Sequence, residues 1–226
     1  MRAVSRRAVL GVALFGFLMA PRRGSVAHAT QVGGPAADSI DDPGAANLTA
    51  PIQALDDGLL EVMRAGKPTP FRDRFHMLAP TVDRVFDLAG ILMVSVGPRW
   101  TTVDQAQQTA LMRVFRRFTV ASYVDNFDSY ADERFDIAPD LRAIGADQVV
   151  STTLVPTNDD PIRIDYVMRH EEDAWKVVDV LLDGTISRVA VQRSDFRGVL
   201  EQGGAPALIA SLERKVADLA GGAPES

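Results

Sequence analysis

The chain contains no cysteine, and only 3 of its 226 residues are histidines. Disulfide bonds and cysteine-containing zinc sites are therefore excluded, so the stability of the fold must come from a packed core. The sequence also lacks the Gly-x-Ser-x-Gly turn of serine hydrolases, the phosphate-binding loop and the dinucleotide fingerprint. The function must therefore be sought outside the common motifs of hydrolases and nucleotide-binding enzymes.

Positive charge is scarce beyond the first 29 residues. This segment carries arginines, an apolar run at residues 8–20 that is short for a membrane span, and the cleavage-site pattern Ala27-His28-Ala29. We expect a cleaved export signal that uses the twin-arginine or the general secretory route. Five of the 24 basic residues lie in it, which leaves 19 against 30 acidic residues and a net charge of −11 afterwards. Such acidity argues against nucleic acid and against non-specific adhesion to anionic membranes.

The composition predicts a single folded domain after this signal. Residues 30–47 are rich in glycine, alanine, proline and aspartate, which predicts a disordered leader. Residues 48–220 are numerous enough to bury a sizeable core, and residues 221–226 form a tail. The domain boundaries predicted are therefore 1–29, 30–47, 48–220 and 221–226.

Apolar residues at helical spacing predict helices at both ends of the domain. Pro80 should kink or split the helix at 71–85, and Thr102 with Gln105 forms a capping-box pattern. The run 86–96 has almost no polar face, which predicts a helix buried on all sides and capped by Gly97. The predicted helices cover residues 48–64, 71–85, 86–96, 102–125 and 187–219, the last broken at Gly203-Gly204.

The middle of the domain predicts strands joined by short turns. Residues 162–169 alternate between apolar and mostly polar side chains, which is the period of a strand. The strand at 175–182 is apolar on both faces, with Trp175, Val177 and Leu181 on one and Val178, Val180 and Leu182 on the other. Both faces should therefore be covered, or one should face an apolar hollow. We predict an α+β fold, in which an antiparallel meander of about four strands is packed by helices.

Few residues suggest chemistry. His76 and His170 are expected on the surface, and the acidic groups at 132–136 and 171–173 lack the spacing of a calcium loop. Asp179 is a carboxylate in an apolar strand and needs a partner, for which Arg193 is the leading candidate. The remaining feature is an excess of apolar residues. Periodicity alone favours an ordinary core over a hydrophobic cavity, because both require apolar side chains.

A family resemblance favours the cavity. Over residues 48–219 the chain resembles the MlaC, or toluene-tolerance, family, and three short strings at 94–100, 126–130 and 186–196 resemble its hopanoid-associated branch, HpnM. The resemblance implies a soluble periplasmic carrier of a lipid-transport ABC system, with a deep apolar pocket for acyl chains. It implies no enzymatic activity, no metal and no cofactor other than bound lipid. The motifs that carry it are Gly97-Pro98-Arg99-Trp100, Phe115-Arg116-Arg117-Phe118, Trp175-Lys176-Val177-Val178-Asp179-Val180 and Arg193-Ser194-Asp195-Phe196.

On this resemblance we expect a monomer that carries phospholipid, or else a hopanoid, between membrane-embedded transporter components. Thr152 and Tyr166 would hold water or a head group near the mouth of the cavity. The rival hypothesis is an isomerase or dehydratase that uses Asp179 as a base, which pairing with an arginine would disfavour. The expected lipid-binding residues are Leu88, Leu92, Val96, Phe115, Phe118, Val150, Thr152, Ile164, Tyr166, Met168, Val178 and Val180.

Overall fold

The computed structural model describes residues 43–221 as an α+β fold, which confirms the predicted fold class. The predicted signal, most of the leader and the end of the tail lie outside these residues. Helix α2 begins at Pro43, so residues 43–47 of the expected leader belong to a helix. The elements are α2 (Pro43–Ala65), α3 (Phe71–Val85), α4 (Leu88–Val96), the 3₁₀ helix η1 (Gly97–Thr102), α5 (Gln105–Asn126), β1 (Arg134–Ile137), β2 (Arg142–Ile144), β3 (Asp147–Val155), β4 (Ile162–Glu171), β5 (Ala174–Leu182), β6 (Ile186–Ser187) and α6 (Arg188–Leu219).

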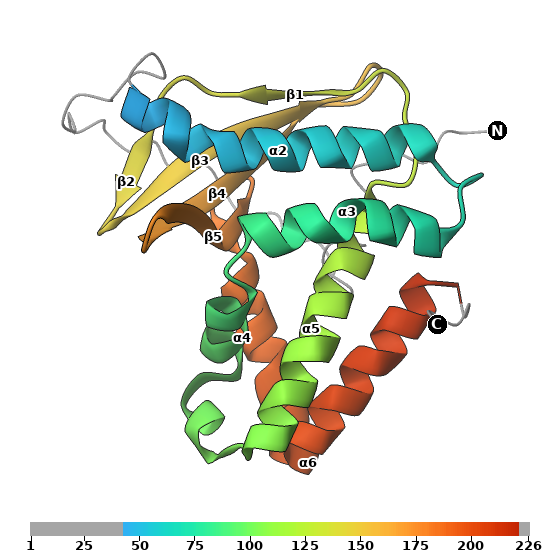
Figure 1. Cartoon of the computed structure of the whole chain (residues 1–226), viewed down its shortest axis with the longest axis vertical. Coiled ribbons are helices and arrows are strands. Elements are labelled where there is room, and N and C mark those ends of the chain that lie inside the picture. The colour runs from blue at the N-terminus through green and yellow to red at the C-terminus, as the bar shows by residue number, and fades with distance from the viewer. Residues whose placement is uncertain (1–42, 222–226) are drawn as a thin grey trace, which may run out of the picture.

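The strands form one antiparallel sheet in the order β1-β3-β4-β5-β6, with β2 paired to β3. The described residues thus form six strands rather than about four, because the prediction missed the short strands β2 and β6. Figure 1 shows α2 and α3 side by side across the sheet, and α4, α5 and α6 grouped beyond them. The fold therefore has a layer of sheet and helices, and a helical part attached to it.

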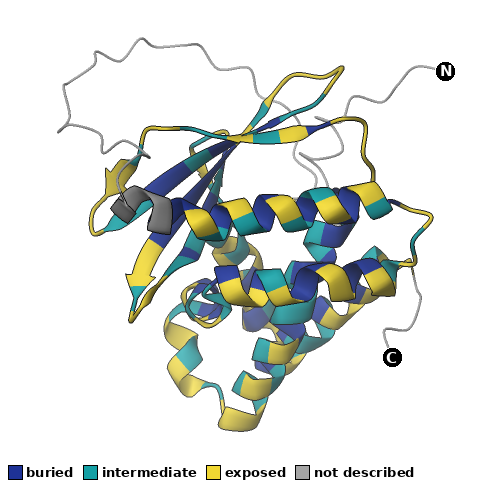
Figure 2. Cartoon of the chain, turned by 45° about the horizontal axis from the view of Figure 1, so that its top comes forward, coloured by how far each residue is buried: buried dark blue, intermediate teal, exposed yellow. Residues whose placement is uncertain are grey.

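The two faces of the sheet differ in what covers them. On the face toward the helices, Tyr166 pairs with Val150 on one side and with Val180 on the other, and all three are buried (Figure 2). The opposite face carries ion pairs, in which Asp165 accepts hydrogen bonds from Arg163 (2.8 Å) and Arg142 (3.1 Å). The helices therefore cover one face of the sheet, while arginine–aspartate pairs lie on the other.

A β-bulge in β5 changes the predicted distribution of its side chains. The pairing with β4 shifts so that Met168 lies opposite Val177 while Val167 lies opposite Asp179, which leaves Val178 as the extra residue. Since opposed residues share a face, Val177 points with Val180 toward the helices. The predicted face of Val178, Val180 and Leu182 is therefore wrong: Val177 is fully buried, and Val178 is only half-buried.

Helix α4 is not buried on all sides, contrary to the prediction. It packs against α5, α6 and β5, and this side contains the buried Ile91, Leu92 and Val96. Its outer side leaves 43% of Met93 and 51% of Val94 exposed. Gly97 does cap the helix, at a φ of +72° that favours glycine.

Two predictions from local sequence signals also differ from the structure. Pro80 lies inside α3, which continues as a single helix from Phe71 to Val85 and is not split. Helix α5 is capped by Asp104, which accepts a hydrogen bond from the Gln107 backbone N–H at 2.9 Å. Thr102 instead belongs to the 3₁₀ helix and donates its hydroxyl to the Arg99 carbonyl. Because Thr102 belongs to the 3₁₀ helix, the N-cap of α5 is Asp104, two residues further along the chain.

Candidate functional site

An apolar hollow lies where α4, α5, β5 and the start of α6 meet. It encloses about 580 Å³ of space, which includes the part that is open to solvent. We call it the apolar hollow and define it by its lining residues: Phe86, Leu88, Ile91, Phe115, Phe118, Thr119, Ser122, Tyr123, Asp179, Val180, Arg188, Val189 and Gln192.

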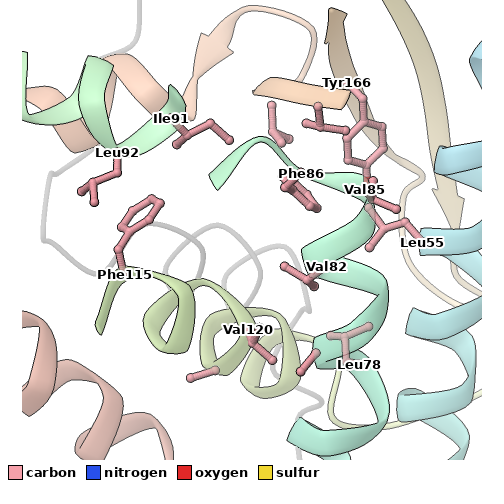
Figure 3. Close-up of a cluster of buried hydrophobic side chains, with 14 of the residues drawn as sticks. Leu55, Leu78, Val82, Val85, Phe86, Ile91, Leu92, Phe115, Val120 and Tyr166 are labelled. Atoms are coloured by element: carbon pink, nitrogen blue, oxygen red, sulfur yellow. The ribbon is translucent and has the colours of Figure 1, made fainter. Parts of the chain in front are cut away.

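The apolar walls come from segments that are distant in sequence, namely residues 86–91, α5, β5 and the start of α6. Ile91 of α4, Phe115 of α5 and Phe86, just before α4, surround the same space in Figure 3. Phe86 is held there because the backbone N–H of Asp87 donates to Val177 of β5 (3.0 Å), while its ring lies 5.7 Å from that of Tyr123. Such a wall suits a hydrocarbon ligand, because its side chains offer contact surface and few polar groups.

The polar part of the wall is formed by the junction of β5 and α6. Ser187 is the N-cap of α6 and accepts from the Ala190 N–H at 2.9 Å. Its hydroxyl donates to Asp179, which also accepts from the backbone N–H groups of Val180 (2.8 Å) and Val189 (3.1 Å). A carboxylate at this end of a helix is stabilised by the unpaired N–H groups and by the helix dipole.

The predicted ion pair between Asp179 and Arg193 is therefore wrong. The carboxylate finds its partners in the backbone and the hydroxyl at the start of α6, one turn before Arg193. Arg193 itself lies beside Gly97, where an added Cβ would be 3.6 Å from its Nε. The arginine that the structure brings to the apolar hollow is Arg188. Burial lowers the pKa of Arg188, although Tyr123, Asp195 and Asp179 act in the opposite direction.

Four of the twelve expected lipid-binding residues line the apolar hollow: Leu88, Phe115, Phe118 and Val180. Seven others are buried and do not line it: Leu92, Val96, Val150, Thr152, Ile164, Tyr166 and Met168. The twelfth, Val178, is the bulge residue of β5. Thr152 and Tyr166 in particular are fully buried away from any mouth. The sheet beneath α2 and α3 is thus filled core, and the hollow lies on the far side of Phe86.

Eight lining residues were not expected. Phe86 and Ile91 belong to the apolar run at 86–96, and Ser122 lies on the apolar stripe of α5, so their positions carried a usable signal. The other polar lining residues carried no such signal in the sequence, because polar side chains on a helix normally face water. The complete set is Phe86, Ile91, Thr119, Ser122, Tyr123, Arg188, Val189 and Gln192.

The other candidate groups are placed as follows. His76 and His170 are exposed, as predicted, and the ring of His170 packs edge-on against Trp175. Between residues 43 and 221, no three acidic or histidine side chains come together in a way that could hold a metal ion. Within the same part of the chain, every helix is too short or too polar to cross a membrane.

Comparison with known proteins agrees with this architecture. The family model described as MlaC protein matches residues 53–214. A solved structure of a phospholipid-binding protein from Ralstonia solanacearum, in complex with a phospholipid, superposes with a TM-score of 0.66 at 22% sequence identity. The match covers 77% of this chain and 99% of that one. No curated protein matches the chain. Because the family model spans well over half of its length, the chain belongs to the MlaC family.

Proposed function

We propose that this protein is a periplasmic carrier that holds the acyl chains of a phospholipid in the apolar hollow. The observation that carries the proposal is the hollow itself: seven aliphatic or phenylalanine side chains, from four parts of the chain, enclose a space that opens to solvent. Membership of the MlaC family and the phospholipid bound to the Ralstonia solanacearum protein support the same function. We further propose that export removes residues 1–29, and that residues 48–220 form the lipid-binding domain.

The energetics explain why such a carrier needs a hollow. Each CH₂ group that leaves water is stabilised by about 0.8 kcal/mol, so two long acyl chains would lose tens of kcal/mol if they crossed water unprotected. Van der Waals contact with Phe115, Phe118 and Leu88 replaces that water. A phospholipid also has a polar end, and we expect Arg188 and Gln192 to face it, since they are the longest polar side chains in the lining.

The rival function, an enzyme with Asp179 as its base, has less support. Asp179 does line the apolar hollow, but its two oxygens already accept three hydrogen bonds, two from the start of α6 and one from Val180 of β5. A carboxylate offers about four lone pairs, so most of its capacity is used by the fold. We infer that Asp179 joins β5 to α6 and does not abstract a proton from a substrate.

The test is to measure the lipid that the purified protein carries. Ser122 lies in the wall on α5, and Ser122→Trp should fill part of the hollow with an indole. We expect solvent extracts of the wild-type protein to contain phospholipid in mass spectrometry, and extracts of the variant to contain at least several-fold less. Thermal melting should remain cooperative in both.

The matched control is Thr109→Trp, on the same helix but outside the lining. It should leave the bound lipid unchanged. Absence of lipid from the wild-type protein, or equal lipid in Ser122→Trp and wild type, would contradict the proposal. The same extracts decide between phospholipid and hopanoid as cargo. Transfer of labelled lipid to membrane-embedded transporter components would test the proposed shuttling. Light scattering would test whether the protein is a monomer, as proposed.

A further inference from the structure

A second hollow lies between α6 and the end of α4, and three arginines meet there. Arg99 of η1 and Arg193 and Arg197 of α6 line it, together with the apolar Val96 and Leu200. It encloses about 910 Å³, including the part open to solvent. The two hollows share no lining residue, and the segments that form this one, η1 and the first half of α6, run toward the lower end of the molecule in Figure 1. We call it the arginine hollow.

These arginines differ from six others between residues 43 and 221, each of which pairs with an aspartate within 4 Å. Arg116, Arg163 and Arg169 each form a close ion pair with an aspartate, at 2.6, 2.8 and 2.7 Å. Within residues 43–221, by contrast, Arg99, Arg193 and Arg197 make no ion pair within 4 Å.

The charge in the arginine hollow is therefore only partly compensated. Glu201 is the one carboxylate in its lining, which leaves a formal charge of +2. This is unusual in an acidic protein, where aspartates are plentiful and each guanidinium could have been given a partner. Cations that converge around a concave space attract an anion and raise its local concentration there.

One of the three guanidinium groups is held in place by the fold, and a second lies close to the backbone. Arg99 donates from Nη1 to the carbonyl of Leu200 at 3.3 Å, which ties η1 to α6. Arg193 lies against the backbone at Gly97, where a Cβ would be 3.6 Å from its Nε and 3.8 Å from its Nη2. A larger residue is disfavoured at Gly97 by its positive φ. A guanidinium held by a hydrogen bond, as that of Arg99 is, loses little conformational entropy when a ligand binds.

We propose that the arginine hollow is a binding site for a phosphate group. The planar guanidinium matches two phosphate oxygens at once, and several arginines can share one phosphate. The apolar contribution of Val96 and Leu200 suits a phosphate that carries an organic substituent. That phosphate comes either from a lipid head group or from a free phosphate ester. The site is separate from the apolar hollow, so it does not depend on the function proposed above.

The experiment uses two water-soluble probes, inorganic phosphate and glycerophosphoglycerol, which is a phospholipid head group without its acyl chains. Isothermal titration at low ionic strength should show saturable binding to the exported protein. Arg193→Gln/Arg197→Gln should weaken that binding about a hundredfold, because each lost charge-assisted contact contributes about 1.4 kcal/mol, or tenfold. Both side chains are exposed, so the variant should melt at the wild-type temperature.

The control is Arg113→Gln/Arg214→Gln, which removes the same charge from exposed positions outside the arginine hollow. It should bind as the wild type does. If glycerophosphoglycerol binds more tightly, the natural ligand of the site is a lipid head group. If inorganic phosphate binds more tightly, the natural ligand is a free phosphate. No binding to the wild type, or equal binding by the two double variants, would overturn the proposal. Lipid extracted from the Arg193→Gln/Arg197→Gln variant should stay at the wild-type amount, so failure here is distinct from failure of the carrier function.

Discussion

Replacing Asp56 by asparagine should stabilise the protein, and the gain should increase with pH. Asp56 lies on the inner side of α2 with 1% of its surface exposed, and neither carboxyl oxygen has a hydrogen-bond partner. Burial, and to a lesser extent the charge of Asp57, raises the pKa of Asp56 to about 8. The folded protein therefore keeps this carboxyl protonated at neutral pH, whereas the unfolded chain ionises it.

The sign and size of the effect follow from the two pKa values. In the unfolded chain the pKa of the carboxyl is about 3.9. Between about pH 4 and about pH 8 the folded state thus holds a proton that the unfolded state has released, so a rise in pH favours unfolding. One proton changes the free energy of unfolding by about 1.4 kcal/mol per pH unit. Between about pH 5 and about pH 8, the free energy of unfolding of the wild type should therefore fall by about 4 kcal/mol relative to that of Asp56→Asn.

Urea denaturation of both proteins at a series of pH values measures this difference directly. The advantage of Asp56→Asn should be smallest near pH 5 and largest near pH 8. Asp57→Asn is the matched control: Asp57 is exposed, and its loss should change the pH dependence only slightly. A constant difference between wild type and Asp56→Asn across the series would show that Asp56 is hydrated or paired in solution, and the reasoning would fail.

Three further predictions concern the site and the helices around it. Asp179→Asn should lower the free energy of unfolding by about 1–3 kcal/mol, because one of the donors at the start of α6 loses its acceptor. The amount of lipid per folded protein should not change. A larger loss of lipid than of folded protein would contradict the structural role of Asp179. Ile164→Asp should abolish the cooperative thermal melt, since Ile164 is in the filled core. Leu88→Asp should keep a cooperative melt but reduce the amount of bound lipid. The reverse outcome for the two variants would place the hollow under α2. Gly204→Ala should cost about 1–2 kcal/mol in urea titrations, because φ is +64° there, and no loss of stability would mean that the break in α6 can relax.

Several elements of the fold were predictable because they depend on neighbours in sequence. The alternation at 162–169 corresponds to β4, and the break in α6 falls at Gly203 and Gly204 as predicted. Gly97 caps α4 because few other residues adopt its positive φ. The three long strands, the short β1 and the α-helices followed from the same local signals, so the α+β class could be predicted from sequence alone.

The position of the hollow depended on tertiary structure. Apolar side chains at Ile164 and at Phe118 look alike in sequence, yet the first is packed beneath α2 while the second lines open space. The bulge at Val178 moved Val177 to the face of Val180, which no periodicity indicated. Asp179 found partners at the start of α6, where the Ser187 hydroxyl and the Val189 backbone N–H donate to it, and the sequence does not indicate this approach of β5 to α6. A pattern of residues specifies which side chains avoid water; whether they meet each other or leave a space between them is decided by how helices and sheet are placed.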